Sequence, residues 1–323
     1  QSFLPEQSQP LYQMMRYQMG WIDESGQPSL FQPPDRLLGS LCLLTAELAA
    51  KDYEIVLEAA AAVELTYNFS LVHTDIQDGS PKRNGRSTVW WIWGPAQAIN
   101  VGNAMHTLAR LALFRLTQNG LSADRVVDAV RLLDEAALRL CEGEYLDLFY
   151  QERIDIFEHQ YLAMAEAKTG ALMGCSMQLG AYLAGLDHSL SNAFAQCGQK
   201  LGVAFQINKD ILGMWGSPDE VDHTPLPEVL NKRKLFPVIY ALDKAPIAQK
   251  RVLGNAYFKR VMEPTDVQNI LGVLDSLDAR QYSQQKAQQL ASEAVEALRI
   301  HGLPEMTISS IQEVIDNLIQ APS

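Results

Sequence analysis

The chain has 323 residues, of which 47% are hydrophobic and 20% charged, so it is long enough to bury a large core in one or two domains. Its net charge of −12, from 26 basic and 38 acidic residues, argues against nucleic acid or an anionic membrane as the main partner, and an anionic ligand would need a local basic pocket. The four cysteines are widely spaced in apolar surroundings and indicate neither a zinc site nor a disulfide framework.

Apolar residues recur at helical spacing along the chain. The first helices are expected over residues 9–22, from the Phe31–Arg36 loop to about Ala50, and over residues 54–74. Further helices are expected over residues 95–118, 122–140, 144–150, 154–169, 171–185, 189–215, 233–246, 248–261, 265–274, 280–301 and 306–320. Because the sequence has no alternating strand run, fixed repeat or low-complexity linker, we expect a single all-α domain over residues 1–323.

The N-terminal residues do not place a basic segment before an apolar core, and no apolar run reaches the ~18 residues that span a bilayer. We therefore expect a cytoplasmic protein without a membrane span.

The first chemical signal lies in residues 63–94. Asp75 and Asp78 are three apart on one face of an expected helix, and the loop behind them holds Lys82, Arg83 and Arg86. Carboxylates at this spacing can share Mg²⁺ ions, and the cations can hold phosphate oxygens through charge-assisted hydrogen bonds. A solvated helix end gives the same spacing, so these residues alone leave diphosphate binding and a surface turn open.

The order of several motifs resembles the trans-prenyl diphosphate synthase, or polyprenyl synthetase, family of the isoprenoid synthase superfamily. Thr74–Asp78 and Arg83–Thr88 stand where the family has an Asp-Asp-x-x-Asp pattern and a basic loop, and the segments Lys168–Gly170, Phe205–Asp210 and Asn231–Pro237 follow in the family's order. The resemblance implies an isoprenoid synthase-type helical bundle around a deep apolar cavity. Two aspartate-rich helices would face one another at its mouth, with Mg²⁺ ions bridging them to an allylic prenyl diphosphate.

The resemblance also assigns roles to individual residues. The aspartate-rich, catalytic positions are Asp75, Asp78, Lys209 and Asp210, of which Asp75, Asp78 and Asp210 keep a metal-binding carboxylate. Diphosphate contacts are expected from Arg83, Lys168, Gln206 and one or more of Lys232, Arg233 and Lys234. The cavity that sets chain length is expected at Phe69, Ser70 and Phe205.

Two departures from the family affect the metal site. Thr74 and Lys209 replace carboxylates, which implies an incomplete metal cluster with a reduced or absent requirement for Mg²⁺. The Lys209 ammonium can pair with a neighbouring aspartate or a phosphate, or it can form a structural ion pair in a site that no longer works. For His73, His106 and Glu144–Asp147 we favour structural roles.

The isopentenyl diphosphate position departs further. Asp35 replaces a lysine, Leu38 and Asn84 replace arginines, and Tyr67 replaces a histidine or glutamine. Because an aspartate repels a diphosphate, we expect this condensing site to be lost, with Arg36 as its residual cation.

Three functions follow from this pattern. We favour a terpene synthase-like enzyme that ionises, cyclises or hydrolyses an allylic prenyl diphosphate without condensing isopentenyl diphosphate. The second hypothesis is a non-catalytic partner subunit or prenyl-chain binder, and the third is a farnesyl or geranylgeranyl diphosphate synthase with atypical motifs. The resemblance further implies a homodimer, with a heteromer containing an active synthase as the alternative.

Overall fold

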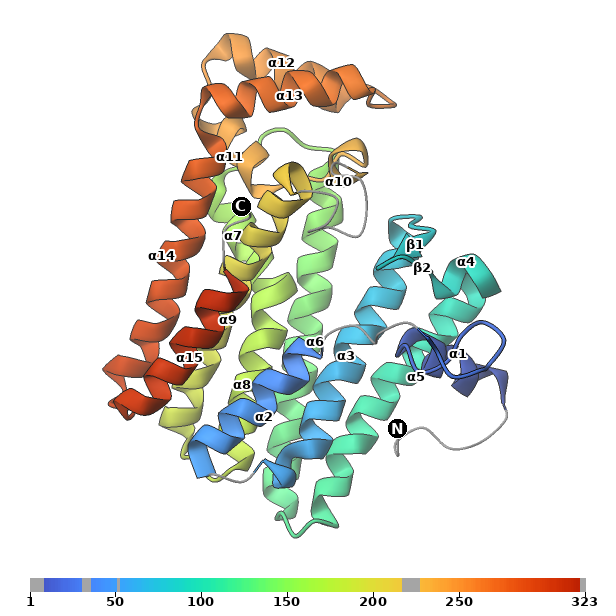
Figure 1. Cartoon of the computed structure of the whole chain (residues 1–323), viewed down its shortest axis with the longest axis vertical. Coiled ribbons are helices and arrows are strands. Elements are labelled where there is room, and N and C mark those ends of the chain that lie inside the picture. The colour runs from blue at the N-terminus through green and yellow to red at the C-terminus, as the bar shows by residue number, and fades with distance from the viewer. Residues whose placement is uncertain (1–8, 31–35, 51–52, 217–226, 320–323) are drawn as a thin grey trace. The chain divides into compact units, whose positions relative to one another are not determined.

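This computed structural model describes residues 9–30, 36–50, 53–216 and 227–319, and helices dominate them (Figure 1). The all-α prediction is therefore confirmed. The α-helices are α1 Pro10–Gln18, α2 Leu37–Ala50, α3 Leu57–Gln77, α4 Val89–Trp93, α5 Pro95–Phe114, α6 Ala123–Gln151, α7 Glu158–Ala165, α8 Ala171–Leu183, α9 His188–Trp215, α10 Pro227–Leu230, α11 Phe236–Lys244, α12 Ile247–Phe258, α13 Pro264–Ser276, α14 Ala279–Ile300 and α15 Glu305–Leu318. Short 3₁₀ turns cover Glu54–Val56 and Arg115–Thr117.

The structure differs from the expected elements in several places. Helix α6 runs unbroken through Gly143, where we expect two helices. The Lys168–Gly170 break is a π-helical turn, Glu166–Gly170, between α7 and α8. Strands β1 (Lys82–Arg83) and β2 (Arg86–Ser87) form a small antiparallel hairpin that has no alternating apolar pattern to reveal it. Residues 31–35 and 217–226, which we expect to be loops, lie outside the described residues.

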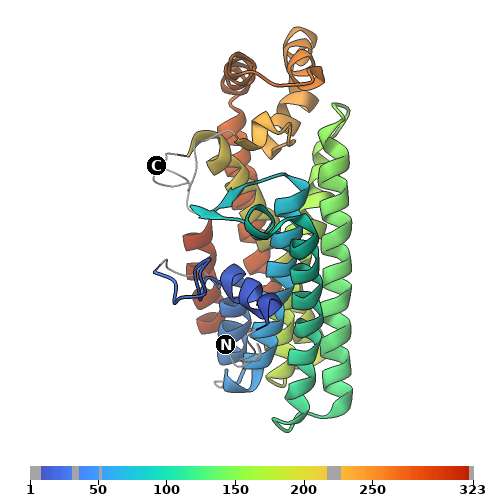
Figure 2. The same cartoon turned by 90° about the vertical axis from the view of Figure 1, so that its right-hand side faces the viewer.

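Contacts within the chain cluster in two compact units, residues 1–137 with 175–192 and residues 138–174 with 193–323. The single-domain interpretation stays a prediction, and each unit is described by itself. In the first unit, α3 packs against α2 and runs side by side with α5 (Figures 1 and 2). Alanines at positions 59, 60 and 62 of α3 are buried. Because their side chains are small, neighbouring helices can approach α3 closely.

The second unit has its own apolar core. The end of α9 and helices α10 to α13 bury a continuous cluster that includes Val238, Leu253, Ile270 and Leu274, all fully buried. Helix α14 packs on α11, α13 and α15, and α12 and α13 lie together as a helical hairpin, orange in Figure 1. The periodic burial of these helices is what the helical spacing of apolar residues predicts.

One helical segment, Glu54–Gln77, is long and apolar enough to cross a membrane by length and composition. The sequence-based statement that no such run exists is therefore wrong. In this structure 67% of its apolar window is buried, as expected of a central core helix in a bundle.

Candidate functional site

Asp75 of the first motif is buried at the end of α3. Only 2% of the residue is exposed, and Arg83 donates from Nε and Nη2 to its Oδ1 at 2.8 Å each. Burial raises the pKa of Asp75 to about 6, even though Arg83 acts to lower it. Asp78 caps the C-terminus of α3 and is half-buried. The structure therefore brings the predicted carboxylate Asp75 and the predicted diphosphate cation Arg83 together as an ion pair.

A tight hairpin turn places Arg83 against α3. Asn84 and Gly85 have φ of 50° and 70° and connect β1 to β2, with Arg83 paired to Arg86 across the ladder. A two-residue turn with both φ values positive matches the twist of a hairpin and favours Asn-Gly. The replacement of the family's arginine by Asn84 thus suits the local backbone. Arg86 donates to the backbone carbonyls of Tyr17 at 3.0 Å and Ile22 at 3.2 Å, so it anchors the hairpin to the N-terminal segment.

At the expected condensing position, Arg36 is already engaged. Its guanidinium donates to the carbonyl of Met19 and lies 3.9 Å from the carboxylate of Glu64. Leu38 is buried and Tyr67 is half-buried, while Asp35 lies outside the described residues. The guanidinium of Arg36 is thus already bound to groups of the first unit. This agrees with the expected loss of the condensing site, and that loss stays a prediction.

Of the expected cavity residues, Phe69 packs against two histidines. Phe69 is 6% exposed, and its ring stacks on His106 with centroids 4.6 Å apart and meets His73 edge-on at 5.7 Å. Ser70 donates to the carbonyl of Tyr67 at 2.7 Å. In the second unit, Phe205 is half-buried. The placement of the two histidines agrees with the structural role that the sequence indicates.

In the second unit, two of the predicted diphosphate cations meet at one carboxylate. Lys168 Nζ lies 2.6 Å from Asp147 Oδ2 and 3.1 Å from Glu144 Oε2, and Arg233 Nη1 donates to the same Asp147 oxygen. Burial alone would raise the pKa of Asp147, but Lys168, Arg233 and Lys209 together hold it below its usual value. Sequence reasoning assigns Asp147 a structural role and misses it as the centre of a cationic cluster.

The backbone explains how Lys168 reaches this cluster. A Cβ on Gly143 of α6 would lie 2.2 Å from the backbone N of Lys168, so only glycine lets the π-helical turn approach α6 this closely. On the opposite side, a Cβ on Gly202 of α9 would lie 2.6 Å from the Cα of Gly170. In the same turn, Thr169 donates to Gln206 Oε1 at 2.9 Å. This hydrogen bond joins the π-helical turn to α9 at Gln206.

Asp210 is buried and bonded on several sides. Its Oδ2 accepts from Tyr161 Oη and, at 2.8 Å, from the backbone N–H of Phe236, and its Oδ1 accepts from Gln206 Nε2 at 2.9 Å. Because Phe236 is the first residue of α11, the Asp210 carboxylate also accepts a hydrogen bond from a backbone N–H group that has no partner within the helix. The neighbouring Lys209 is exposed and acts on Asp147 through its charge.

The three cations of residues 232–234 differ in environment. Lys234 is only 2% exposed. Its Nζ donates to the carbonyl of Gln151 at 2.8 Å and lies 4.0 Å from the centre of the Tyr257 ring. Burial and the charge of Lys232 lower the pKa of Lys234 to about 7. Lys232 is half-exposed with φ of 62°. Of the three, Arg233 is the one that reaches the Asp147 cluster.

A Mg²⁺ site needs several oxygen donors in one place. Among the described residues, no group of three or more His, Cys, Asp or Glu side chains is arranged to hold a metal ion. Asp75 is paired with Arg83, and Asp210 accepts hydrogen bonds from Gln206 and from the backbone N–H of Phe236. Among the described residues, neither unit by itself therefore offers the donor set of the three-metal cluster that the family implies, and the reduced requirement for Mg²⁺ stays a prediction.

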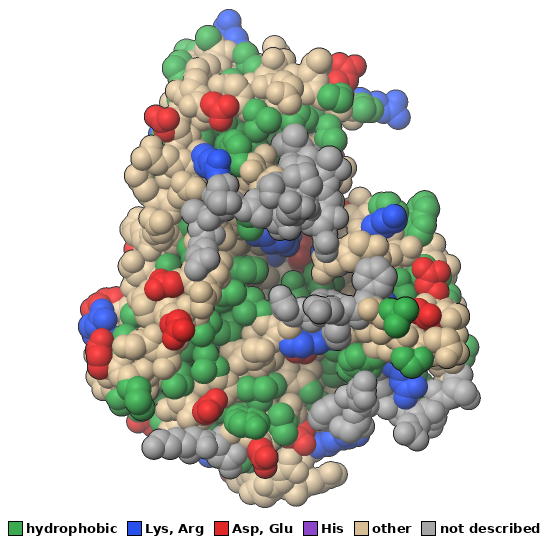
Figure 3. All heavy atoms as spheres, in the orientation of Figure 1, with side chains coloured by type: hydrophobic (Ala, Val, Ile, Leu, Met, Phe, Trp, Pro, Cys, Tyr) green, Lys and Arg blue, Asp and Glu red, His purple; other side chains and the backbone are tan. Residues whose placement is uncertain are grey.

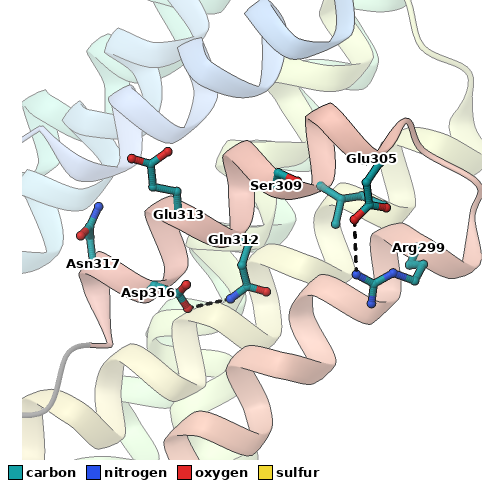
Figure 4. A pocket seen from close by; sticks show the side chains of 8 residues that line it. Arg299, Glu305, Ser309, Gln312, Glu313, Asp316 and Asn317 are labelled. Atoms are coloured by element: carbon teal, nitrogen blue, oxygen red, sulfur yellow. Dashed lines mark hydrogen bonds and ion pairs between the residues drawn. The ribbon is translucent and has the colours of Figure 1, made fainter.

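A surface pocket of about 330 Å³ lies between α14 and α15 (Figure 4). Its lining carries the carboxylates of Glu305, Glu313 and Asp316, and Glu305 lies 4.0 Å from Arg299. It contains none of the predicted site residues, and its acidic lining does not suit a diphosphate.

Comparisons with known proteins agree on the family. A model of the polyprenyl synthetase family matches residues 20–274. The (2E,6E)-farnesyl diphosphate synthase of Mycobacterium tuberculosis is 28% identical over 309 residues, which cover 95% of this chain and 85% of that protein. The geranylgeranyl diphosphate synthase of the same organism is 32% identical over 291 residues, which cover 90% and 82%.

Solved structures give the same result. The polyprenyl synthetase of Streptomyces coelicolor has a TM-score of 0.90 and 30% sequence identity, covering 98% of this chain and 94% of that chain. A geranylgeranyl pyrophosphate synthetase from Geoglobus acetivorans has a TM-score of 0.82 and 28% identity, covering 99% and 95%. The chain belongs to the polyprenyl synthetase family, so the resemblance drawn from the motifs is confirmed. The family relationship favours a prenyl diphosphate synthase over the terpene synthase-like enzyme that the motif changes suggest.

Proposed function

We propose that this protein is a prenyl diphosphate synthase-type enzyme of isoprenoid biosynthesis that binds an allylic prenyl diphosphate and forms farnesyl or geranylgeranyl diphosphate. The named relatives, which are farnesyl and geranylgeranyl diphosphate synthases, support this function over the alternatives. The aspartate-rich residues Asp75, Asp78, Lys209 and Asp210, and the facing of the two motifs that the family implies, stay predictions.

The observation that carries the proposal is the cluster around Asp147. Lys168 and Arg233 come from separate elements and converge on one carboxylate, with their side chains only 14% and 11% exposed, and the charge of Lys209 also acts there. Charge-assisted hydrogen bonds to oxyanions are strongest where water is largely excluded. A diphosphate offers such oxygens, so it can take over the two cations from Asp147.

We propose that Mg²⁺ takes part with a reduced requirement or none. Lys209 stands where the family has a carboxylate, and the described carboxylates do not form a three-donor group. The cations of the Asp147 cluster then supply much of the counter-charge that metals supply in the family.

A second candidate is an enzyme that uses the allylic diphosphate without isopentenyl diphosphate. The specific observation in its favour is the engagement of Arg36, the residual cation of the condensing position, by Met19 and Glu64. This cation is not available to a second diphosphate without breaking those contacts.

Product analysis separates the candidates. The purified protein is incubated with geranyl, farnesyl or geranylgeranyl diphosphate, each with and without isopentenyl diphosphate and with Mg²⁺ or EDTA. Longer prenyl diphosphates support the proposed synthase, whereas hydrocarbons or alcohols formed without isopentenyl diphosphate support the second candidate. Absence of turnover in every mixture overturns both and favours the non-catalytic partner subunit or prenyl-chain binder.

A matched pair of variants tests the binding cluster itself. Arg233→Gln should weaken binding of inorganic diphosphate roughly 10- to 150-fold, because a hydrogen bond to a charged group contributes about 1.5–3 kcal/mol. Arg139→Gln removes an arginine of the same unit that pairs with Glu166 at 2.9 Å on the surface, and it should leave binding unchanged. Equal effects of both substitutions would show that the Asp147 cluster is not the diphosphate site.

The homodimer implied by the family and the cytoplasmic location expected from the sequence are proposals as well. Light scattering of the purified protein measures the mass directly. A mass of one chain would contradict the homodimer, and co-purification with a second synthase from the native cells would support the heteromer.

A further inference from the structure

One segment of the second unit has a charge opposite to that of the chain as a whole. Residues 244–262 contain five basic side chains and no Asp or Glu, although the whole chain has a net charge of −12. The basic residues are Lys244, Lys250, Arg251, Lys259 and Arg260. The segment comprises the end of α11, all of α12 and the turn before α13.

The cations of this segment are not all neutralised. Lys259 lies 2.8 Å from Asp266 and Lys244 lies 2.8 Å from Asp243, whereas Lys250 donates only to a backbone carbonyl. Arg251 and Arg260 are exposed, and neither has a hydrogen bond or ion pair within the part of the chain that the structure describes. Their charge is available to an external anionic surface.

The same segment exposes large apolar side chains. Ile247, Phe258 and Val261 are 73%, 68% and 72% exposed. At about 100° per residue, Ile247, Arg251 and Phe258 fall within about 40° of each other on one face of α12. The opposite face buries Leu253 in the core of the unit. Figure 3 shows hydrophobic and basic side chains next to each other over α12 and α13.

We propose that the exposed face of α12 with Ile247, Arg251 and Phe258, together with Arg260 and Val261 of the turn that follows α12, is a docking surface for an anionic lipid bilayer. Basic side chains are attracted to anionic headgroups, and exposed aromatic and aliphatic side chains insert at the boundary between headgroups and acyl chains. A purely acidic protein partner would use the cations and leave the apolar side chains without a role.

The net charge of the chain does not prevent this contact. Interactions between exposed charges are screened over about 8 Å at physiological ionic strength, so the bilayer responds to the local cations more than to distant carboxylates. The surface contact differs from a membrane span, since α12 stays folded on its own core.

Vesicle flotation tests the proposal. The full chain is mixed with vesicles of phosphatidylcholine alone, or of phosphatidylcholine with phosphatidylserine, at low and physiological salt. We expect flotation with the anionic vesicles only, and weaker flotation at the higher salt. The double substitution Arg251→Glu with Phe258→Ser should lower the partition coefficient at least about tenfold.

The control is a double variant of an exposed arginine and an exposed apolar residue elsewhere in the second unit. Arg299, which pairs with Glu296, and Ile300 at the end of α14 are also exposed, with Ile300 at 73%, and Arg299→Glu with Ile300→Ser makes the same change in charge and a comparable change in apolar surface. We expect it to alter the partition coefficient by less than about twofold. Far-UV circular dichroism of both double variants checks that each remains folded.

Three results would overturn the proposal. They are no flotation with anionic vesicles, equal flotation with neutral vesicles, or equal losses in the α12 variant and its control. A change in oligomeric mass on substitution of Arg251 and Phe258, with vesicle binding unaffected, would instead assign the face to contacts between copies of the chain.

Discussion

Replacement of Asp147 by asparagine tests the electrostatic account of the second unit most directly. The substitution preserves shape but removes the negative charge that Lys168 and Arg233 share, with Asp147 only 6% exposed. Breaking a buried ion pair by removing one partner costs about 3–5 kcal/mol of unfolding free energy. Because Glu144 remains 3.1 Å from Lys168, we expect a loss near the lower limit, about 3 kcal/mol.

The assay is urea unfolding followed by far-UV circular dichroism, with and without inorganic diphosphate. In the Asp147→Asn variant the two cations keep no shared counter-charge, so diphosphate should raise its unfolding free energy more than that of the wild type. The control is Asp155→Asn, which removes an exposed partner of Arg153 and should change the unfolding free energy by less than about 1 kcal/mol.

The pH dependence provides a second check. The pKa of Asp147 is lowered in the folded state. The contribution of this carboxylate to the unfolding free energy is therefore present above the ordinary carboxylate pKa, about 3.9, and is lost as the pH falls below that value. The variant should lack this acid-dependent loss. A loss no larger than that of Asp155→Asn, or an equal effect of diphosphate on variant and wild type, would refute the reasoning.

Substitutions at three further positions have expected outcomes. Burial lowers the pKa of Lys234 to about 7, so charging this lysine in the folded state is unfavourable. The unfolding free energy of Lys234→Met should therefore rise relative to that of the wild type as the pH falls from about 10 to 7. Unfolding curves at both pH values measure this, and equal changes in the unfolding free energy of the two proteins would contradict it. Gly143→Ala should destabilise by about 1–3 kcal/mol, since its Cβ overlaps the backbone of Lys168, and an unchanged melting curve would argue against the close approach. Asn84→Val should destabilise by about 1–2 kcal/mol at its positive φ, while Asn84→Gly should be close to neutral in the same melting assay.

Sequence reasoning reached the helical class and the family because both depend on local patterns. Apolar residues at helical spacing predict which segments form helices. The order of the motifs around Asp75, Lys168 and Asp210 can still be recognised when single residues differ from the family pattern. The hairpin of residues 82–87 was missed because two-residue strands contain too few residues for a periodic signal. Its Asn84-Gly85 turn was the one local signal that could have revealed it.

The tertiary structure decided what each charged group does. The sequence places Arg83, Arg86, Lys234 and Arg233 in basic segments, but only folding pairs Arg83 with Asp75, binds Arg86 to backbone carbonyls and buries Lys234 over an aromatic ring. Asp147 and Arg233 are 86 positions apart, and no local period connects them. The reason is physical: helix formation depends on neighbours within a few residues, whereas the availability of a charge depends on burial and on partners that distant segments bring to it.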